Sequence, residues 1–265
     1  MITSRAGVTP SVADRLSNSR VQQLYRLRLA TSGSDVKAAQ RLRFQVFNME
    51  LGEGLAHAYL SGLDADLFDD ACDHLLVEEV STGTLAGTYR LQTGLRAMAT
   101  HGFYSAQEFD LEPLIAPKGR LEQMVELGRA CVHRQHRNLV VLGLLWQGIA
   151  AYAKERGGRY LIGCSSVNSQ NPAEGIALYE ALRQRHLAPE EWLTRPMPGY
   201  ECTVYGAVPP LSQTVKPPKL MSAYFSIGAK ICGPPALDAE FQTIDFLTLL
   251  DLEKLPASVA SRYNI

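Results

Sequence analysis

The sequence has few cysteines, and their placement excludes common cysteine-based sites. The 265 residues contain five, far apart and without a C-x-x-C pair: Cys72, Cys131, Cys164, Cys202 and Cys232. Such spacing argues against structural zinc and is typical of a reduced, cytosolic chain. His57, His74 and His101 also lack metal-ligand spacing, so the sequence predicts no metal.

The chain also lacks an excess of either charge and any long apolar run. Its 26 basic and 27 acidic residues give a formal net charge of -1, which argues against a nucleic-acid partner bound by general phosphate neutralisation. The longest apolar run, residues 139–146, is far shorter than the roughly 20 residues of a membrane span. The polar residues 1–20 have no apolar signal core and are expected to form a flexible tail. We therefore expect a cytoplasmic protein, soluble or peripheral at the inner membrane.

The apolar spacing that is present predicts alternating strands and helices. Residues 25–30 alternate as in a half-buried strand, and residues 36–47 follow a cap at Ser34 or Asp35 with helical spacing. Further predicted elements are a hairpin at 74–91, strands at 124–132, 159–167 and 200–208, and helices at 138–157 and 171–186. This order predicts an α/β (α+β) domain over residues 21–208, with helices flanking a mixed sheet.

A Pro-rich stretch beginning at Pro209 marks the start of a C-terminal extension, residues 209–265. Within it, Phe241, Ile244, Leu247 and Leu250 recur at helical intervals. We therefore expect a helical extension that packs on the main domain.

The stretch "VELGRACVHRQHRNLVVLGLLWQGIAAYAKERGG", residues 125–158, reads as a strand, a basic turn and a helix. This order resembles the cofactor core of the GNAT acetyltransferase superfamily, where turn glycines approach the pyrophosphate of coenzyme A. Asn138 and Val140 occupy the expected glycine positions, and a β-branched residue resists that approach. The turn still offers enough positive potential for a single phosphodiester through His133, Arg134, His136, Arg137 and Asn138. A solvated basic turn explains the same residues.

Several segments in the same order carry a family resemblance over residues 25–255. These are "DDACDHLLVEE", "AGTYRLQ", "HGFYSAQEFDL", "ELGRACV", "LLWQGIAAYA", "YLIGCSSV" and "PPKLMSAYFSIGAKICGPPALDAEFQTIDFLTLLD". Together they resemble the bacterial ornithine-lipid N-acyltransferases, which are related to N-acyl amino acid synthases and acyl-homoserine-lactone synthases. The resemblance implies a GNAT fold and transfer of a 3-hydroxyacyl chain from acyl carrier protein to the α-amine of ornithine. It also implies lyso-ornithine lipid as an amphiphilic product, with the phosphopantetheine thioester on the carrier in place of any bound cofactor.

The resemblance assigns the general base to Glu126, directly or through water, as in the related synthases. A backbone N–H near Gly128 or Ala130 would supply the oxyanion donor. The alternative is a structural Glu126 bonded to Arg129 or Arg90.

Arg90 and Arg129 stand in otherwise apolar strands, so each needs a partner. The candidates are a substrate carboxylate, the pantetheine phosphate, or the pair Asp70 and Asp73. The two aspartates match the acidic pair that lines the amino-substrate pocket of homoserine-lactone synthases. They would also suit a helix or turn cap.

Three further positions match related enzymes. Arg43 and Phe47 match a mobile segment over the acyl site, although a core helix with one salt-bridged Arg explains the same residues. Tyr179 is similar in position to the acetyltransferase Tyr that protonates the leaving thiolate. The rival functions are N-acylation of another amino acid, a catalytically silent lipid- or partner-binding module, and an ordinary coenzyme-A acetyltransferase.

Overall fold

The structure, a computed structural model, describes residues 24–204 and 216–263. Its described strands form one mixed sheet in the order β1-β2-β3-β4-β5-β8-β6, and β7 also pairs with β8. The strands are β1 (Tyr25–Leu29), β2 (Asp73–Glu79), β3 (Leu85–Thr93), β4 (Met124–Val132), β5 (Tyr160–Val167), β6 (Lys230–Ile231), β7 (Ala236–Asp238) and β8 (Thr243–Asp251). A mixed α/β fold with flanking helices was expected from the sequence and is confirmed.

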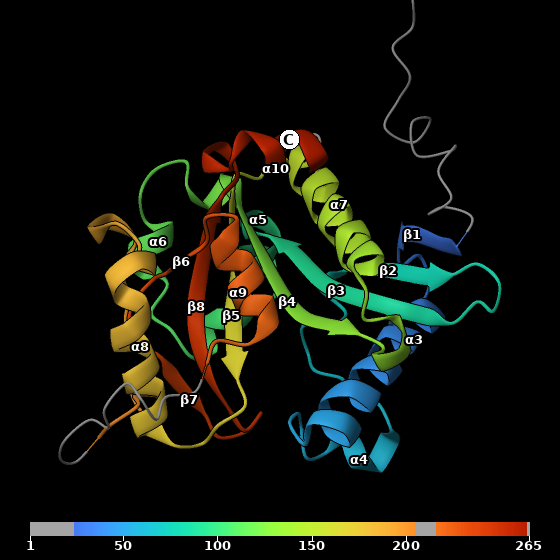
Figure 1. The fold of residues 1–265 in the computed structure, drawn as a ribbon, viewed down its shortest axis with the longest axis horizontal. Helices are drawn as coiled ribbons and strands as arrows, with labels where there is room; N and C mark the ends of the chain where they lie inside the picture. The colour runs from blue at the N-terminus through green and yellow to red at the C-terminus, as the bar shows by residue number, and fades with distance from the viewer. Residues whose placement is uncertain (1–23, 205–215, 264–265) are drawn as a thin grey trace, which may run out of the picture.

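Helices cover both faces of the sheet (Figure 1). The longer ones are α3 (Gly33–Phe44), α7 (Leu139–Glu155), α8 (Pro172–His186) and α9 (Lys219–Ser226). The shorter ones are α4 (Ala58–Ser61), α5 (Gly94–Ala99), α6 (Glu112–Ile115) and α10 (Ala257–Tyr263). The predicted helices at 138–157 and 171–186 are thus confirmed as α7 and α8.

The largest core cluster lies between α7 and the sheet. Leu145 and Ile149 of α7 are fully buried against Val77, Leu91 and other strand residues. α9 packs on this same face beside Trp146. α7 is apolar on most of its sides, and such a helix must be buried on most of its sides. The sheet and α9 together bury it.

The opposite face of the sheet carries α3 and the segment from α5 to α6. Leu42, Val46 and Phe47 of α3 and its π-helical continuation (Gln45–Leu51) pack near Cys131 of β4. Phe109 and Leu114 pack near Ile162 of β5 and Leu247 of β8. The cap of α3 is Ser32, two residues before Ser34 and three before Asp35, the two expected caps.

The parallel pair β4 and β5 separates partway along its length. Pairing covers only Met124–Glu126 against Tyr160–Ile162, although β4 continues to Val132 and β5 to Val167. Beyond that point β4 stays with β3 while β5 stays with β8. The two strands therefore open a gap in the middle of the sheet (Figure 1).

The C-terminal extension differs from the expected helical segment. Of the segment predicted as a helix from Phe241 to Leu250, all residues from Thr243 onward form β8, which pairs with β5 along the whole of β5. Nearly all of β8 is buried on both sides, and a strand covered on both faces shows no period-2 pattern. Two helices, α9 and α10, do lie in the extension, but the segment completes the sheet as well as packing on it.

Some expected features fall outside the description. The tail at residues 1–20, residues 205–208 of the expected strand at 200–208, and residues 209–215 of the Pro-rich stretch lie outside the described residues. The described part of that expected strand, residues 200–204, forms only an isolated bridge from Glu201 to Ala236, so the strand prediction is wrong there. In the part of the chain that the structure describes, no helix has the length and apolar character required to cross a membrane.

Candidate active site

A cavity of about 400 Å³ occupies the gap between β4 and β5. One part of its wall is apolar and lies under α7 and α9, with residues Tyr89, Leu91, Leu127, Trp146, Leu161, Met221, Tyr224 and Leu250. The other part is polar and charged, with residues Glu53, Arg90, Gln92, Tyr104, Ser105, Glu126, Arg129, Asp238 and Asp245. The cavity can therefore hold an apolar chain and a charged group at the same time.

Glu126 is buried at the point where β4 and β5 separate, and its carboxylate is held by three donors. The backbone amide of Ser105 donates to Oε1 at 2.7 Å. The amide of Tyr104 and Nε2 of Gln92 donate to Oε2 at 2.8 and 2.6 Å. Because an ionised carboxylate has about four acceptor positions, one position remains for a substrate proton or a water. Among the described residues, the donors to Glu126 are thus Gln92, Tyr104 and Ser105, and not Arg90 or Arg129, the alternative partners expected from the sequence.

Gly128 faces open space beside Glu126. A side chain built there would meet nothing nearer than Nε of Arg90 at 3.9 Å. The adjoining Arg129 has φ 51°, and the register of β4 against β3 shifts at this point. This bulge bends the strand away from β5 and leaves room for a reacting group. Whether the backbone at Gly128 or Ala130 supplies an oxyanion donor stays a prediction.

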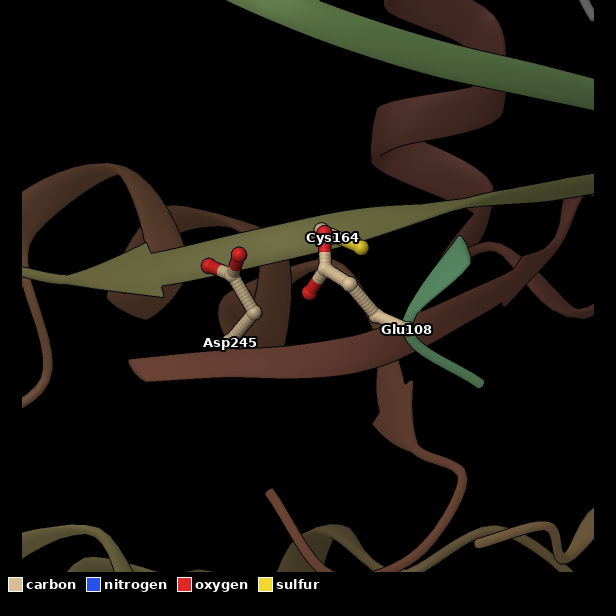
Figure 2. Close-up of side chains that lie close together, drawn as sticks. All are labelled: Glu108, Cys164 and Asp245. Carbon is tan, nitrogen blue, oxygen red and sulfur yellow. The ribbon is translucent and has the colours of Figure 1, made fainter. Parts of the chain in front are cut away.

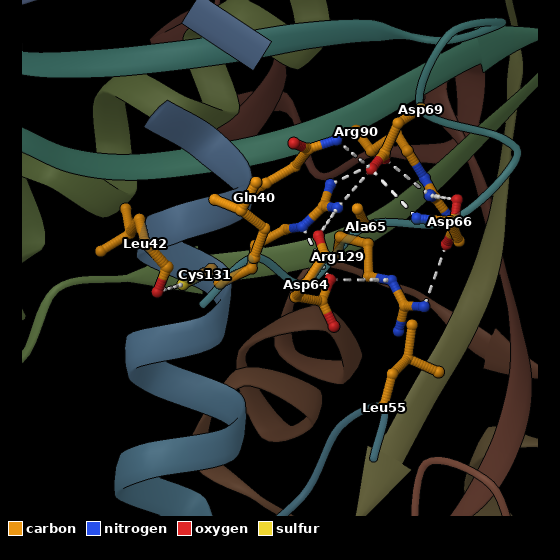
Figure 3. A network of polar contacts seen from close by, with 12 residues as sticks. Gln40, Leu42, Leu55, Asp64, Ala65, Asp66, Asp69, Arg90, Arg129 and Cys131 are labelled. Atoms are coloured by element: carbon orange, nitrogen blue, oxygen red, sulfur yellow. Dashed lines mark hydrogen bonds and ion pairs between the residues drawn. The ribbon is translucent and has the colours of Figure 1, made fainter. Parts of the chain in front are cut away.

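A buried network of ion pairs lies behind the cavity wall (Figure 3). Arg90 binds Asp66 and Asp69 at 2.5 and 3.0 Å, and Arg129 binds Asp66 at 3.0 Å. Arg43 pairs with Asp64 and Asp69 at 2.8 and 2.6 Å. The guanidiniums beside them lower the pKa of Asp66 and Asp69 despite the opposing effect of burial. The three arginines and three aspartates thus neutralise one another in the protein interior.

This network corrects the expected partners of Arg90 and Arg129. Asp70 is exposed, and Asp73 binds Arg96 and Tyr152, so neither aspartate lines the cavity. The sequence signal for the true partners was the run "LDADLFDD", in which the earlier aspartates turn inward. Arg43 was expected in a mobile segment over the acyl site, but the structure places it fully buried and ion-paired.

Of the two aromatic candidates, Phe47 lines the cavity and Tyr179 does not. Phe47 lines the cavity and packs edge-on against Phe241, with ring centroids 5.3 Å apart. Tyr179 lies on α8, where it packs against a separate cluster and the guanidinium of Arg183, and it does not line the cavity. Tyr179 therefore lies away from the gap, because α8 packs over β8, and its role as proton donor to the leaving thiolate stays a prediction.

The basic turn between β4 and α7 is mostly engaged in structural contacts. The ring of His136 is buried and its Nδ1 lies 3.0 Å from the hydroxyl of Tyr25. Arg137 makes two bonds to Glu50, at 2.5 and 2.9 Å. Oδ1 of Asn138 accepts the amides of Val140 and Val141, both at 3.0 Å. Two amides at the helix N-terminus are therefore already used, which disfavours a diphosphate there. His133 is half-buried and Arg134 is exposed at the end of this turn.

An acidic group that the sequence reasoning missed lies at the polar end of the cavity (Figure 2). The carboxyl groups of Glu108 and Asp245 and the thiol of Cys164 have ligand atoms within 4.8 Å of one another. Burial and the neighbouring carboxylates raise the pKa of Glu108 well above its usual range and that of Asp245 to about 6. Burial raises the pKa of Glu53, also in the cavity wall, to about 7. A lone Asp in the apolar run "TIDFLTLL" was the available sequence signal.

Comparison with known folds defines the class of protein. The family model described as an acetyltransferase (GNAT) domain matches residues 42–147. The structure of an N-acyl amino acid synthase from uncultured soil microbes superposes with a TM-score of 0.51, at 12% identity, over 87% of this chain and 91% of that one. A CoA-dependent acyl-homoserine lactone synthase gives a TM-score of 0.50 at 14% identity, over 91% and 96% of the two chains. The fold is therefore GNAT-like, with a mixed sheet and flanking helices.

Sequence relatives narrow the class to a family. The chain is 32% identical to an L-ornithine N(alpha)-acyltransferase of Brucella abortus, over 90% of this chain and 88% of that protein. It is 34% identical to an L-ornithine N(alpha)-acyltransferase of Agrobacterium fabrum, over 89% and 82%. The chain belongs to the L-ornithine N(alpha)-acyltransferase family and is an acyltransferase.

Proposed function

We propose that this enzyme transfers a 3-hydroxyacyl chain from acyl carrier protein to the α-amine of ornithine, giving lyso-ornithine lipid. The observation that supports this most is the single cavity with an apolar part and a charged part that meet at Glu126. The acyl chain would lie under α7 and α9, and the amino acid would lie at the polar end. The thioester carbon would then sit in the gap between β4 and β5.

The reaction that fits this arrangement is direct attack of an amine on a thioester. The α-ammonium of ornithine loses one proton to Glu126, directly or through a water in its remaining acceptor position. The neutral nitrogen forms a bond to the carbonyl carbon, and the C–S bond breaks. The second proton lost by the nitrogen ends on the departing thiolate. The products are an amide and a free thiol, with one proton released to solvent.

The charges of the cavity favour an amino acid with a second ammonium. Arg90 and Arg129 line the wall and offer guanidiniums to the α-carboxylate, and their own charge is balanced by the aspartates behind them. Glu53, Asp238 and Asp245 then leave the cavity with acidic groups in excess. Ornithine carries two ammonium groups and one carboxylate, so its net positive charge complements this wall.

The donor proposal rests on the turn before α7. A coenzyme-A donor brings a diphosphate, but Asn138 already caps α7 and a Val stands at a glycine position. A carrier-bound phosphopantetheine brings a single phosphodiester, for which His133 and the exposed Arg134 are the remaining groups of the turn. Basic side chains at this edge would also attract an acidic carrier protein, and the amphiphilic product would leave toward the inner membrane.

The testing experiment is a mass-spectrometric assay of the purified full chain. The protein is given 3-hydroxyacyl carrier protein or the matching coenzyme-A ester, together with a pool of amino acids. Acyl-ornithine formed from the carrier-bound donor alone is the expected result. Equal use of coenzyme A would contradict the donor proposal, and acylation of a different amino acid would contradict the acceptor. If neither donor acylates any amine, a lipid- or partner-binding module explains the cavity better.

A further inference from the structure

Two buried carboxyl groups at the polar end of the cavity lack the donors that buried carboxylates need. Glu108 is 2% exposed, and neither of its oxygens has a hydrogen-bond donor among the described residues. Asp245 is 3% exposed; its Oδ2 accepts from Oγ1 of Thr243 at 3.3 Å, whereas its Oδ1 has no donor in the part of the chain described. Asp245 lines the cavity, Glu108 does not, and their two carboxyl groups lie close together (Figure 2).

The surrounding groups do not supply the missing positive charge. Arg129 is the cation that acts on Glu108, but its charge is already balanced by Asp66. Oδ1 of Asp238 already accepts the amides of Glu240 and Phe241. The other titratable or polar groups that act on the pair are Glu53, Tyr104, Cys164, Ser166, Tyr200, Cys202 and Thr243. Two like charges this close are costly unless one is protonated or a cation lies between them.

The chemistry of Cys164, the third residue of this group, favours an ammonium over a metal ion as the ligand. Cys164 is partly buried in the cavity wall, and desolvation raises the pKa of its thiol well above the usual range. A metal ion would need the thiolate of Cys164, which burial disfavours, and the thiol already donates to Oγ of Ser105 at 3.6 Å. Two carboxyl groups and a neutral thiol suit the three N–H donors of a primary ammonium.

Ser105 connects this acidic pair to the proposed base. Its backbone amide binds Glu126 at 2.7 Å, its hydroxyl contacts Cys164, and its carbonyl accepts the amide of Glu108 at 3.2 Å. Glu126 and Asp245 both line the cavity, so a molecule with its α-amine at Glu126 can direct its side chain toward Asp245. Both ends belong to one continuous cavity.

We propose that Asp245, supported by Glu108, binds the side-chain ammonium of the amino-acid substrate and so selects dibasic amino acids over neutral ones. This inference rests on the proposed function and assigns its acceptor selectivity to specific side chains. Binding of the ammonium stabilises both carboxylates in the ionised state. Substrate binding then releases protons from the pair.

The first test is calorimetric binding of L-ornithine and L-norvaline, which has the same chain length but no side-chain ammonium. Wild-type protein binds ornithine at least 10-fold more tightly than norvaline and releases protons near pH 6. In Asp245→Asn the preference falls to within about 3-fold, and proton release decreases. Glu108→Gln gives a smaller loss in the same direction. Asp251→Asn, on the same strand but paired with Arg159 outside the cavity, keeps the preference.

A second test separates failure of this inference from failure of the proposed function. Ornithine and norvaline compete for acylation, and the ratio of kcat/KM is measured for wild type and Asp245→Asn. Transfer that favours ornithine equally in both proteins overturns the ammonium site and leaves the function standing. A wild type that prefers neither amino acid in binding or in transfer also overturns it. Tight Zn²⁺ or Mn²⁺ binding that Asp245→Asn abolishes, with ornithine binding unchanged, would assign the pair to a metal ion and overturn the proposal.

Discussion

The backbone amide of Ser105 donates a hydrogen bond to Oε1 of Glu126 at 2.7 Å, across the edge of the gap between β4 and β5. The neighbouring amide of Tyr104 binds the other carboxylate oxygen. The segment Tyr104–Gln107 is a short 3-10 turn, so its consecutive amides point the same way. Glu126 is thereby fixed by main-chain groups, which no single side-chain substitution in the turn removes.

Replacing Asp66 of the ion-pair network should destabilise the protein far more than replacing Asp70. Asp66 joins Arg90 to Arg129, and Asp66→Asn leaves buried positive charge without its partner. We expect a loss of about 3 to 5 kcal/mol in the free energy of unfolding. Asp70→Asn, four residues away and exposed, should change it by less than about 0.5 kcal/mol. Urea unfolding of both variants measures the difference, and equal effects would contradict the network.

Gly163 should be indispensable at the point where β4 and β5 begin to separate. A side chain at this position would overlap the carbonyl oxygen of Leu127 on the facing strand. Gly163→Ala should therefore push the strands apart, lowering the melting temperature and acyl transfer together. Gly143→Ala is the matched control, because nothing lies near that position in α7. It should stabilise the protein by about 0.5 to 1 kcal/mol through helix propensity. A stable, active Gly163→Ala would show that the gap does not depend on this contact.

The apolar part of the cavity should limit the length of the acyl chain. Ala130 lies in the cavity wall on β4, near Trp146 in the contacting cluster. Ala130→Phe fills part of this space, so the variant should prefer shorter donors while its KM for ornithine changes less than about 2-fold. Competition between donors of different chain length, followed by mass spectrometry, measures the shift. An unchanged length profile would place the chain elsewhere.

The acidic pair should make the protein less stable as the pH rises. Burial raises the pKa of Asp245 to about 6 in the folded protein, above about 3.9 for an unfolded aspartate. The folded state therefore holds more protons between these values, so stability from this group is complete below about pH 4 and is lost as the pH rises through 6. Asp245→Asn removes this loss, so the free energy of unfolding of the variant should exceed that of wild type by about 1 to 3 kcal/mol at pH 8. Thermal unfolding at pH 5 and pH 8 measures the difference, and a variant that is less stable at both values would contradict the buried charge pair.

Local patterns in the sequence were sufficient for much of the fold. The β2–β3 hairpin, α7 and α8 follow from alternation, capping residues and glycines that act within a few positions. β8 was missed because its apolar residues also fit a helical interval. Only its place between β5 and the short strands β6 and β7, which is a long-range property, makes it a buried strand.

The site was predictable where chemistry alone required a partner. Buried Arg90 and Arg129 had to meet carboxylates, but the loop that supplies Asp64, Asp66 and Asp69 is placed by tertiary packing. The pairing of Glu108 with Asp245 joins residues far apart in the chain. No local pattern brings them together, which explains why the acidic end of the cavity was not foreseen.

The most direct test of the central claim is acyl transfer to ornithine by Glu126→Gln under saturating donor. The amide keeps one oxygen but turns its NH₂ toward a main-chain donor, so a loss of about 1 to 2 kcal/mol in stability is expected. The folded variant should show kcat at least about 100-fold lower with KM for ornithine nearly unchanged. The exposed Glu122→Gln is the control and should retain wild-type activity. A folded Glu126→Gln with wild-type kcat would contradict the assignment of the base and the account built on it.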